Sequence, residues 1–369
     1  MVKIKHVLKF IIPKNIREFL LHLKNLLIET YDKCLIPASV KHIYGPEKIE
    51  YGENEVIVIC TVLNGSVYIK SFIEHYLSLG VKHIVLLDNN SEDDTVSIAR
   101  DYKNVTILSS KIPASYRCYR VLLLREYLIR RFCRHRWCLV ADIDELFDYP
   151  FSDSIPITQL LEYLNRNSYT AVLSQMLDMF SNKPLSELKN TKEGPLKELY
   201  QYYDISDIKK VSYHSKIFGR LPGKNILADQ SIMFHIGGIR KAIFGTDNWL
   251  TKHQLIFVEK VRLVHPHWAV DVVCADFSAA CYHYKFAGNF YETALRYSNA
   301  RFGYAVSEYE AIVSKCRGDP SLGLKRATAE KIYSTEDLIK NGFLFVSKNY
   351  LEWARRCSER VARSNGSAS

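Results

Sequence analysis

Apolar segments alternate with amphipathic ones along the first half of the chain. Residues 56–63 form a near-continuous β-branched run, which is typical of a strand buried on both faces of a parallel sheet. Apolar side chains then recur at helical spacing over 69–77, and Gly80 marks the end of that helix. The alternation continues through strands and helices at 83–87, 96–102, 105–109, 115–135 and 137–141. This order predicts an α/β fold with an open, mostly parallel sheet and helices on both faces.

The segments on either side of this unit are patterned less regularly. Apolar residues over 16–27 recur at helical spacing beside lysines, which indicates a basic amphipathic N-terminal helix. Beyond residue 150, strand-like runs stand at 170–177, 231–236, 255–264 and 272–284, and helical patterns follow at 290–316 and 335–355. We therefore expect three parts: an N-terminal helical segment over 1–50, a sheet domain over 51–290, and a C-terminal helical extension with a frayed tail over 291–369.

Composition narrows the class of protein. The 369 residues are 47% hydrophobic and 24% charged, which fits a globular protein and excludes disordered, collagen-like and coiled-coil chains. Nine scattered cysteines without a CxxC pair indicate reduced thiols. No apolar run approaches the ~18 residues that a membrane span needs, and the N-terminus lacks a signal-peptide pattern. We expect a cytoplasmic protein whose N-terminal helix either contacts the inner, anionic face of a membrane or docks on its own core.

Acidic residues follow the fourth predicted strand. Asp142 and Asp144 stand where that strand ends and the chain turns, so both carboxylates can approach one ligand. Carboxylate oxygens with open coordination positions suit Mn²⁺ or Mg²⁺ that bridges to a substrate diphosphate. The simpler alternative is an acidic turn at the end of a strand. The net charge of +10 allows a phosphorylated ligand but does not select one.

Polar residues also end the first two predicted strands. Thr61 and Asn64 end the first, and Asp88 and Asn90 open the loop after the second. Because ligands of open parallel sheets bind at the carboxyl ends of the strands, these side chains are candidates for contacts with a nucleotide's base and ribose. The alternative for Asp88 and Asn90 is an Asx-turn that leads into the next helix.

Several segments resemble family-2-type glycosyltransferases of the GT-A fold, in a bacterial branch. LGVKHIVLLDNNSEDDT at 79–95 resembles the start of that domain, and WCLVADIDELF at 137–147 is similar to its metal-binding strand. The run over 280–297 resembles its distal end, so the resemblance covers about 55–345. It implies a metal-dependent enzyme that moves a sugar, with inversion, from a nucleotide-diphosphate sugar to an acceptor hydroxyl. The expected acceptor is a surface glycan or a lipid-linked saccharide.

The resemblance also implies residue roles. Asp144 would bind the metal directly, Asp142 would contact ribose or metal-bound water, and Asp88 would hold the nucleotide. His283 matches a histidine that often adds a metal or diphosphate contact near the end of the domain. The histidines of HPHW at 265–268 are weaker candidates, because histidines on apolar strands are more often part of the core.

The expected catalytic base is the least defined of these roles. Inverting members need a carboxylate that takes the proton of the acceptor hydroxyl. Asp178, at the end of a predicted strand, is the favoured candidate, with Asp229 and Asp247 as alternatives. Arg240 and Lys241 follow a glycine pair that allows close backbone approach, so they are candidates for diphosphate binding, Arg240 first.

Two other functions fit parts of the pattern. A nucleotidyltransferase on a similar sheet would need a basic, glycine-rich loop after the first strand, and NGSVYIK at 64–70 supplies one glycine and one lysine. A non-catalytic basic module could bind RNA or an anionic membrane through the Arg-rich segment at 117–136. The acidic turn at 142–145 would repel phosphate without a metal, so nucleic acid is the less favoured partner. That basic segment can also steer a donor's phosphates or be a solvated face.

Overall fold

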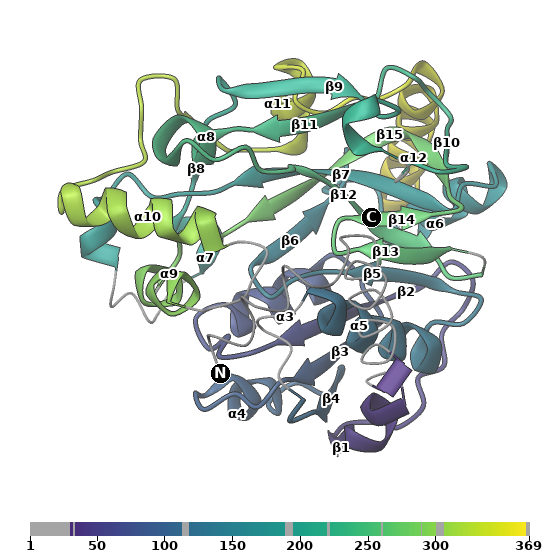
Figure 1. Cartoon of the computed structure of the whole chain (residues 1–369). Helices are drawn as coiled ribbons and strands as arrows, with labels where there is room; N and C mark the ends of the chain where they lie inside the picture. The colour runs from purple at the N-terminus through teal and green to yellow at the C-terminus, as the bar shows by residue number, and fades with distance from the viewer. Residues whose placement is uncertain are drawn as a thin grey trace, which may run out of the picture.

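The structure of the protein, a computed structural model, describes residues 30–31, 34–112, 118–188, 195–219, 222–259, 261–288, 290–299 and 306–366. Figure 1 shows one twisted central sheet that runs through the molecule, with helices packed against it. The amphipathic helix expected over 16–27 lies outside the described residues. In the described part of the chain, no helix combines the length and the apolar character that crossing a membrane requires.

Four parallel strands form the first half of the sheet. β2 (Val56–Val62), β3 (His83–Asp88), β4 (Val105–Ser109) and β5 (Trp137–Val140) lie in the order β4-β3-β2-β5. These strands are almost entirely buried, which explains their continuous apolar sequences. At the outer edge, β1 (Lys41–Tyr44) pairs antiparallel with β4. The four predicted strands are confirmed.

The second half of the sheet is mixed. β12 (Thr251–Phe257) runs antiparallel between β5 and β7 (Ala171–Asp178), and β7 is parallel to the long β15 (Val273–His283). β15 also pairs antiparallel with β6 (Glu145–Asp148) and parallel with β10 (Ile226–Leu227). The predicted fold class, α/β with an open sheet of GT-A type and helices on both faces, is confirmed, and β1, β6 and β12 are its antiparallel strands.

Two predicted strands differ from the structure. The run expected over 255–264 is divided, because β12 ends at Phe257 and β13 (Arg262–His265) forms its own hairpin with β14 (Trp268–Val270). The run expected over 231–236 is β11 (Met233–Gly237), which pairs with β9 (Ile208–Ser212) in a separate two-stranded sheet. Polar residues after Phe257 interrupt the first run, whereas the second shows that strand pattern does not determine which sheet a strand joins.

Helices cover both faces of the sheet. α3 (Ile69–Ser78) and α6 (Ile157–Arg166) pack into one apolar cluster, in which Phe72 is fully buried. α5 (Cys118–Phe132) packs into the cluster on the opposite side through residues that include Leu124. The apolar side chains of α3 recur at the three- and four-residue spacing that was expected, and the helix ends two residues before Gly80, which has φ of 90°.

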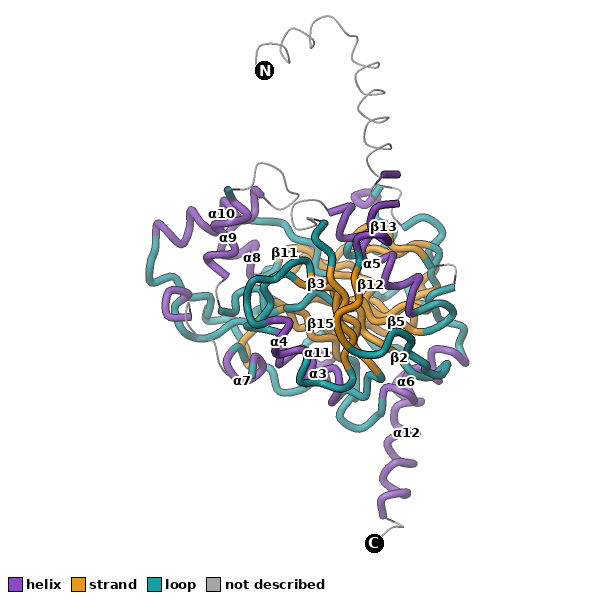
Figure 2. Tube along the Cα trace, turned by 90° about the horizontal axis from the view of Figure 1, so that it is seen from below, coloured by secondary structure: helices purple, strands orange, loops and turns teal. Residues whose placement is uncertain are grey.

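The C-terminal part adds four helices to the same molecule. α9 (Phe290–Ser298) and α10 (Val306–Gly318) contact each other, and α11 (Thr335–Lys340) precedes α12 (Lys348–Gly366). Tyr350 of α12 is buried in the main core, while Figure 2 shows the far end of this helix projecting from the body. The remaining short elements are α4 (Thr95–Ala99), α7 (Leu196–Leu199), β8 (Tyr202–Tyr203), α8 (Ile239–Phe244), β16 (Glu330–Lys331) and 3-10 helices at Leu185–Leu188 and Lys216–Phe218.

Candidate active site

A cavity of about 800 Å³ opens where β2, β5 and β15 end. Its lining combines the turn at 61–64 after β2, the turn at 142–145 after β5, and the end of β15 with Lys285. The β13–β14 turn and the facing residues of α9 and α10 complete the wall. The cavity therefore lies at the edge of the sheet where the sequence places its polar strand ends.

The turn after β5 holds Asp142 and Asp144, two aspartates separated by one residue, which together form a DxD motif. The Glu145 N–H donates to the Asp142 carbonyl oxygen at 3.0 Å, and the Asp142 N–H donates to Glu145 Oε2 at 3.0 Å, so Glu145 closes the turn from both sides. Ile143, between the aspartates, packs against Gly65, where a Cβ would lie 3.0 Å from Ile143 Cγ1. A glycine at that position lets the end of the first strand approach the turn that carries Asp142 and Asp144.

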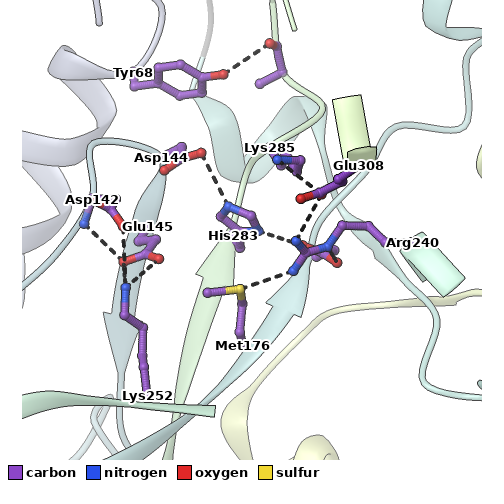
Figure 3. Close-up of polar contacts among 12 residues, drawn as sticks. Tyr68, Asp142, Asp144, Glu145, Met176, Arg240, Lys252, His283, Lys285 and Glu308 are labelled. Atoms are coloured by element: carbon purple, nitrogen blue, oxygen red, sulfur yellow. Dashed lines mark hydrogen bonds and ion pairs between the residues drawn. The ribbon is translucent and has the colours of Figure 1, made fainter. Parts of the chain in front are cut away.

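Asp142 is held by two cations. Arg125 of α5 donates to Oδ1, and Lys252 Nζ of β12 lies 3.5 Å from Oδ2. Lys252 also donates to both carboxylate oxygens of Glu145 at 2.7 Å (Figure 3). Burial opposes ionisation of Asp142, but Arg125 and Lys252 outweigh it and hold the pKa of Asp142 well below its usual range. These four residues are the Asp142 cluster, and its aspartate side chain is still 37% exposed.

Asp144 has a different partner. Its Oδ2 lies 3.3 Å from Nε2 of His283, and Nδ1 of the same ring lies 2.5 Å from Asp178 Oδ1. Parallel pairing of β7 and β15 places Asp178 directly opposite His283, which explains the second contact. Burial disfavours the charged imidazole, but Asp144 and Asp178 outweigh it and raise the pKa of His283 to about 9. In the protein as it stands, His283 is therefore a buried imidazolium between two carboxylates.

The contacts continue beyond Asp178. Arg240 of α8 donates to Asp178 Oδ2 at 2.8 Å and lies 3.3 Å from Glu308 of α10, which also lies 3.3 Å from Lys285 (Figure 3). We name the six connected residues from Asp144 to Lys285 the Asp144 chain. The chain ties the first turn of α10 to the end of the sheet, so one wall of the cavity is fixed by ion pairs.

The two groups balance their charges in different ways. The Asp142 cluster contains two permanent cations and two carboxylates. The Glu145 carboxylate faces hydrogen-bond donors in each of its described contacts, and although burial raises its pKa, the charge of Lys252 opposes that shift. The Asp144 chain contains three carboxylates but only two permanent cations, so its balance depends on the proton of His283.

The predicted nucleotide contacts divide into two groups. Thr61 and Asn64 line the cavity, together with Asn89, which the sequence reasoning did not single out. Asn64 has φ of 53°, a conformation that asparagine tolerates, and its N–H donates to Ser91 Oγ at 2.8 Å. This contact joins the turn after β2 to the loop after β3.

Asp88 and Asn90 lie outside the cavity lining. Asp88 is buried and accepts the Ser91 N–H, three residues along the chain, at 3.1 Å, so it shapes the loop through a contact one residue longer than the expected Asx-turn. Asn90 is exposed and has φ of 69°. The structure therefore gives Asp88 a defined part in shaping the loop, and nucleotide binding by Asp88 and Asn90 stays a prediction.

Candidates for the catalytic base lie at different depths. Asp178 is buried beneath the cavity lining, and both of its oxygens are engaged by His283 and Arg240. Asp247 lines the cavity with a side chain 64% exposed and pairs with Lys241 at 2.9 Å, whereas Asp229 does not line it. An acceptor hydroxyl would reach Asp178 only after these contacts opened, so its assignment as the base stays a prediction. Arg240, the candidate for diphosphate binding, lines the cavity, but its guanidinium group is already paired with Asp178.

The side chains around Asp144 fit a metal site in which water and ligand fill most coordination positions better than one in which protein side chains fill them all. Within the described ranges, no group of three or more His, Cys, Asp or Glu side chains surrounds a common metal position. Asp144 and His283 nevertheless present a carboxylate and, once deprotonated, an imidazole nitrogen to one point, and Asp178 fixes the ring as outer partners of metal ligands do. Mn²⁺ or Mg²⁺ with few protein ligands fills its other positions with water and phosphate oxygens. The structure separates Asp142 from this pair, because two cations already neutralise it.

Sequence reasoning missed the residues that hold the aspartates. Arg125 lies in a segment whose charges were expected to steer phosphates or face solvent, and Lys252 lies in a strand whose start was not detected. The signal in the sequence was TKHQ at 251–254, where a lysine and a glutamine two residues apart share one face of a strand. Both donate to Glu145.

Comparison with known proteins gives little further guidance. No family model matches the chain, and no curated protein matches it. It has a likeness, over 92% of its length and 94% of the other chain, to a mannosyltransferase from Pyrobaculum calidifontis in complex with GDP-Man and Mn²⁺, at 14% identity and a TM-score of 0.28. A second likeness, to a UDP-glucose pyrophosphorylase complexed with UDP-glucose, covers 43% of this chain and 67% of the other, at 8% identity and a TM-score of 0.24. A third, to a mycobacterial protein, covers 36% of this chain and 44% of the other, at 17% identity and a TM-score of 0.23. At such TM-scores these likenesses carry no argument about activity, and the fold class is defined by the strand order.

Proposed function

We propose that the protein is a metal-dependent glycosyltransferase that moves a sugar from a nucleotide-diphosphate sugar to an acceptor hydroxyl. One observation supports this function most directly: two aspartates in one turn at the end of a buried strand face a cavity that the end of the first strand also lines. A simple acidic turn would leave its carboxylates in solvent. Here Asp142 and Asp144 each have a buried cationic partner, and both line the cavity.

The cavity has the chemical parts that this reaction requires. Thr61, Asn64 and Asn89 supply polar groups at one end, where a nucleoside can bind. Asp144 and His283 can hold a divalent ion, which when bound neutralises charge on the leaving diphosphate. The volume of about 800 Å³ accommodates a ligand of nucleotide-sugar size.

In the proposed transfer, the acceptor oxygen bonds to the anomeric carbon while the bond from that carbon to the diphosphate oxygen breaks. The leaving diphosphate keeps the electron pair, and the acceptor's proton passes to a carboxylate. Asp178 remains the candidate from sequence reasoning, and Asp247 is the candidate that lies in the cavity. We propose inversion at the anomeric carbon from the family resemblance.

We propose a saccharide or lipid-linked saccharide as the acceptor. The basic segment before residue 30 would bring the enzyme to the anionic inner face of a membrane, where lipid-linked acceptors are found. Liposome flotation of the full chain and of a variant with the lysines at 3, 5, 9 and 14 replaced by glutamine tests this association. Equal recovery of both would contradict it.

Binding of nucleoside diphosphates provides the test of function. We expect one of UDP, GDP, CDP, dTDP or ADP to raise the melting temperature selectively, and only with Mn²⁺ or Mg²⁺ present. Sugar nucleotides of the base so identified are then assayed for release of the nucleoside diphosphate and for transfer. D144N should abolish the metal-dependent shift, while D229N, which alters a carboxylate outside the cavity lining, should retain it. Failure of every nucleotide to bind, with or without metal, would contradict the proposal, and release of pyrophosphate would indicate a nucleotidyltransferase instead.

A further inference from the structure

Lys252 is a buried cation that lies behind the cavity wall. Its side chain is 1% exposed and comes from the second residue of β12. It is not among the residues that line the cavity, so a donor in the cavity would not touch it. Burying an ammonium group is costly unless its partners are well placed, and here the partners are both oxygens of Glu145 and, at 3.5 Å, Asp142 Oδ2. A lysine in this position needs an explanation beyond packing.

The partner of Lys252 controls the geometry of the turn. Glu145 Oε2 accepts the Asp142 N–H at 3.0 Å and the Gln254 side-chain amide at 3.3 Å, in addition to Lys252. The backbone of Glu145 is fixed separately, because β6 pairs with β15 so that Glu145 stands opposite His283. The orientation of the Glu145 carboxylate therefore determines whether the turn from Asp142 to Glu145 stays closed.

We propose that Lys252 is a positioning residue for donor binding. It holds the Glu145 carboxylate against the Asp142 N–H and draws the Asp142 side chain inward, so that Asp142 and Asp144 keep a fixed separation before any ligand arrives. Figure 3 shows Lys252 rising from below toward the carboxylates of Glu145 and Asp142. This inference rests on the proposed function, because the ligand that benefits is the metal-bound diphosphate of the donor.

The competing explanation is that Lys252 and Glu145 only stabilise the fold. Breaking a buried ion pair by removing one partner destabilises a protein, whereas removing both charges often does not. Stability alone therefore cannot distinguish the two explanations, and the variants must separate stability from binding. K252M removes the charge and keeps the length of the side chain, and E145Q/K252M removes both charges.

Y163F is the matched control. The Tyr163 hydroxyl donates to the buried Asp276 at 2.9 Å; neither residue lines the cavity, and Asp276 keeps its contact with Ser347 in the variant. This substitution lowers stability by removing a buried contact to a carboxylate, without altering the turn after β5. It shows what a purely structural loss does to ligand binding.

The first experiment measures binding of the preferred nucleoside diphosphate with Mn²⁺ by calorimetry. We expect K252M to raise Kd at least tenfold and Y163F to leave it within twofold. In E145Q/K252M the melting temperature should recover most of the loss while Kd stays raised. Unchanged affinity in K252M, or full recovery of affinity in the double variant, would overturn the positioning role. If K252M does not fold, the Kd of E145Q/K252M decides: a raised Kd supports the positioning role, and full recovery of affinity overturns it.

Hydrogen exchange gives a reading that needs no ligand. The peptide over residues 137–148 contains the Asp142 amide, which Glu145 protects. We expect this peptide to exchange faster in E145Q/K252M than in Y163F when the two are compared at equal stability, and equal exchange would overturn the inference. If the wild-type protein binds no nucleoside diphosphate, the proposed function fails, while the exchange result still decides whether Lys252 positions the turn.

Discussion

The two aspartates of the DxD turn are two residues apart, yet their surroundings differ. Asp142 contacts Arg125 and Lys252, whose charges are permanent, in a cluster that is neutral as it stands. Asp144 contacts His283, whose charge can leave as a proton. The comparison teaches that spacing in a motif does not define the role of each residue: the Asp142 cluster is balanced by permanent cations, whereas the balance of the Asp144 chain depends on one removable proton.

The largest expected effect separates the lysines of the two groups. K252M leaves Glu145 buried without its cation, and we expect it to lower the free energy of unfolding by about 3–5 kcal/mol. K285M removes a lysine of the Asp144 chain whose partner Glu308 keeps Arg240, so its cost should be much smaller. Urea unfolding followed by far-UV circular dichroism measures both. Equal losses would show that the cluster and the chain do not differ in this respect.

The next effect concerns activity. D144N removes the carboxylate that faces His283 in the cavity, and we expect transfer to fall by about 100-fold or more, because charge on the leaving diphosphate loses its stabilisation. The side chain of Asp144 is 24% exposed and Asp178 still pairs with His283, so the loss of stability should be smaller than in K252M. Rates of nucleoside diphosphate release at saturating donor measure the loss. Normal turnover in folded D144N would exclude Asp144 as a metal ligand.

A smaller effect tests how His283 is oriented. D178N keeps the shape of the side chain but weakens the acceptor that fixes Nδ1 of the ring. Replacement of such outer partners commonly lowers metal affinity by about 10- to 100-fold, and we expect a loss in this range for Mn²⁺, measured by titration calorimetry. D247N, in the cavity but outside the chain, is the control for affinity. If transfer collapses in D178N while Mn²⁺ affinity is unchanged, Asp178 is the base and not the support of His283.

The sequence predicts where Asp142 and Asp144 lie better than it predicts the residues that contact them. Alternating strands and helices place Asp142 and Asp144 at the edge of a sheet, because parallel strands end together. The Asp144 chain could be predicted only in pieces: Asp178, Arg240 and His283 were each singled out, but their contacts depend on β7 lying beside β15.

Lys252 was not predicted for a related reason. It reaches Asp142 from 110 residues away, through an antiparallel strand inserted between β5 and β7. A register irregularity between His253 and Leu255 also affects which side chains of that strand share a face. Neither strand order nor such an irregularity is visible in hydrophobic periodicity.

The smallest expected effect is a pH dependence that only the Asp144 chain should show. His283 has a pKa of about 9 in the folded protein against about 6.5 in the unfolded chain, so the folded state binds more protons between these values. In EDTA, its contribution to stability is complete below pH 6.5 and is lost as the pH rises toward 9, by at most roughly 1.4 kcal/mol per pH unit.

Other buried histidines do not mask this slope. Burial lowers the pKa of His75 to about 3 and that of His253 to about 4, so both are neutral in either state above pH 7.5. Burial raises the pKa of thiols such as Cys60, Cys138 and Cys281, so thiols that begin to ionise in the unfolded chain as the pH approaches about 8.5 also lower stability, but they do so equally in the wild type and in H283Q. Urea unfolding of the wild type and of H283Q between pH 7.5 and 8.5 therefore isolates one proton in the difference between the two: stability of the wild type should fall with pH more steeply than that of H283Q. Parallel curves would mean that the Asp144 chain, like the Asp142 cluster, is balanced without a removable proton, and the difference between the two aspartates would disappear.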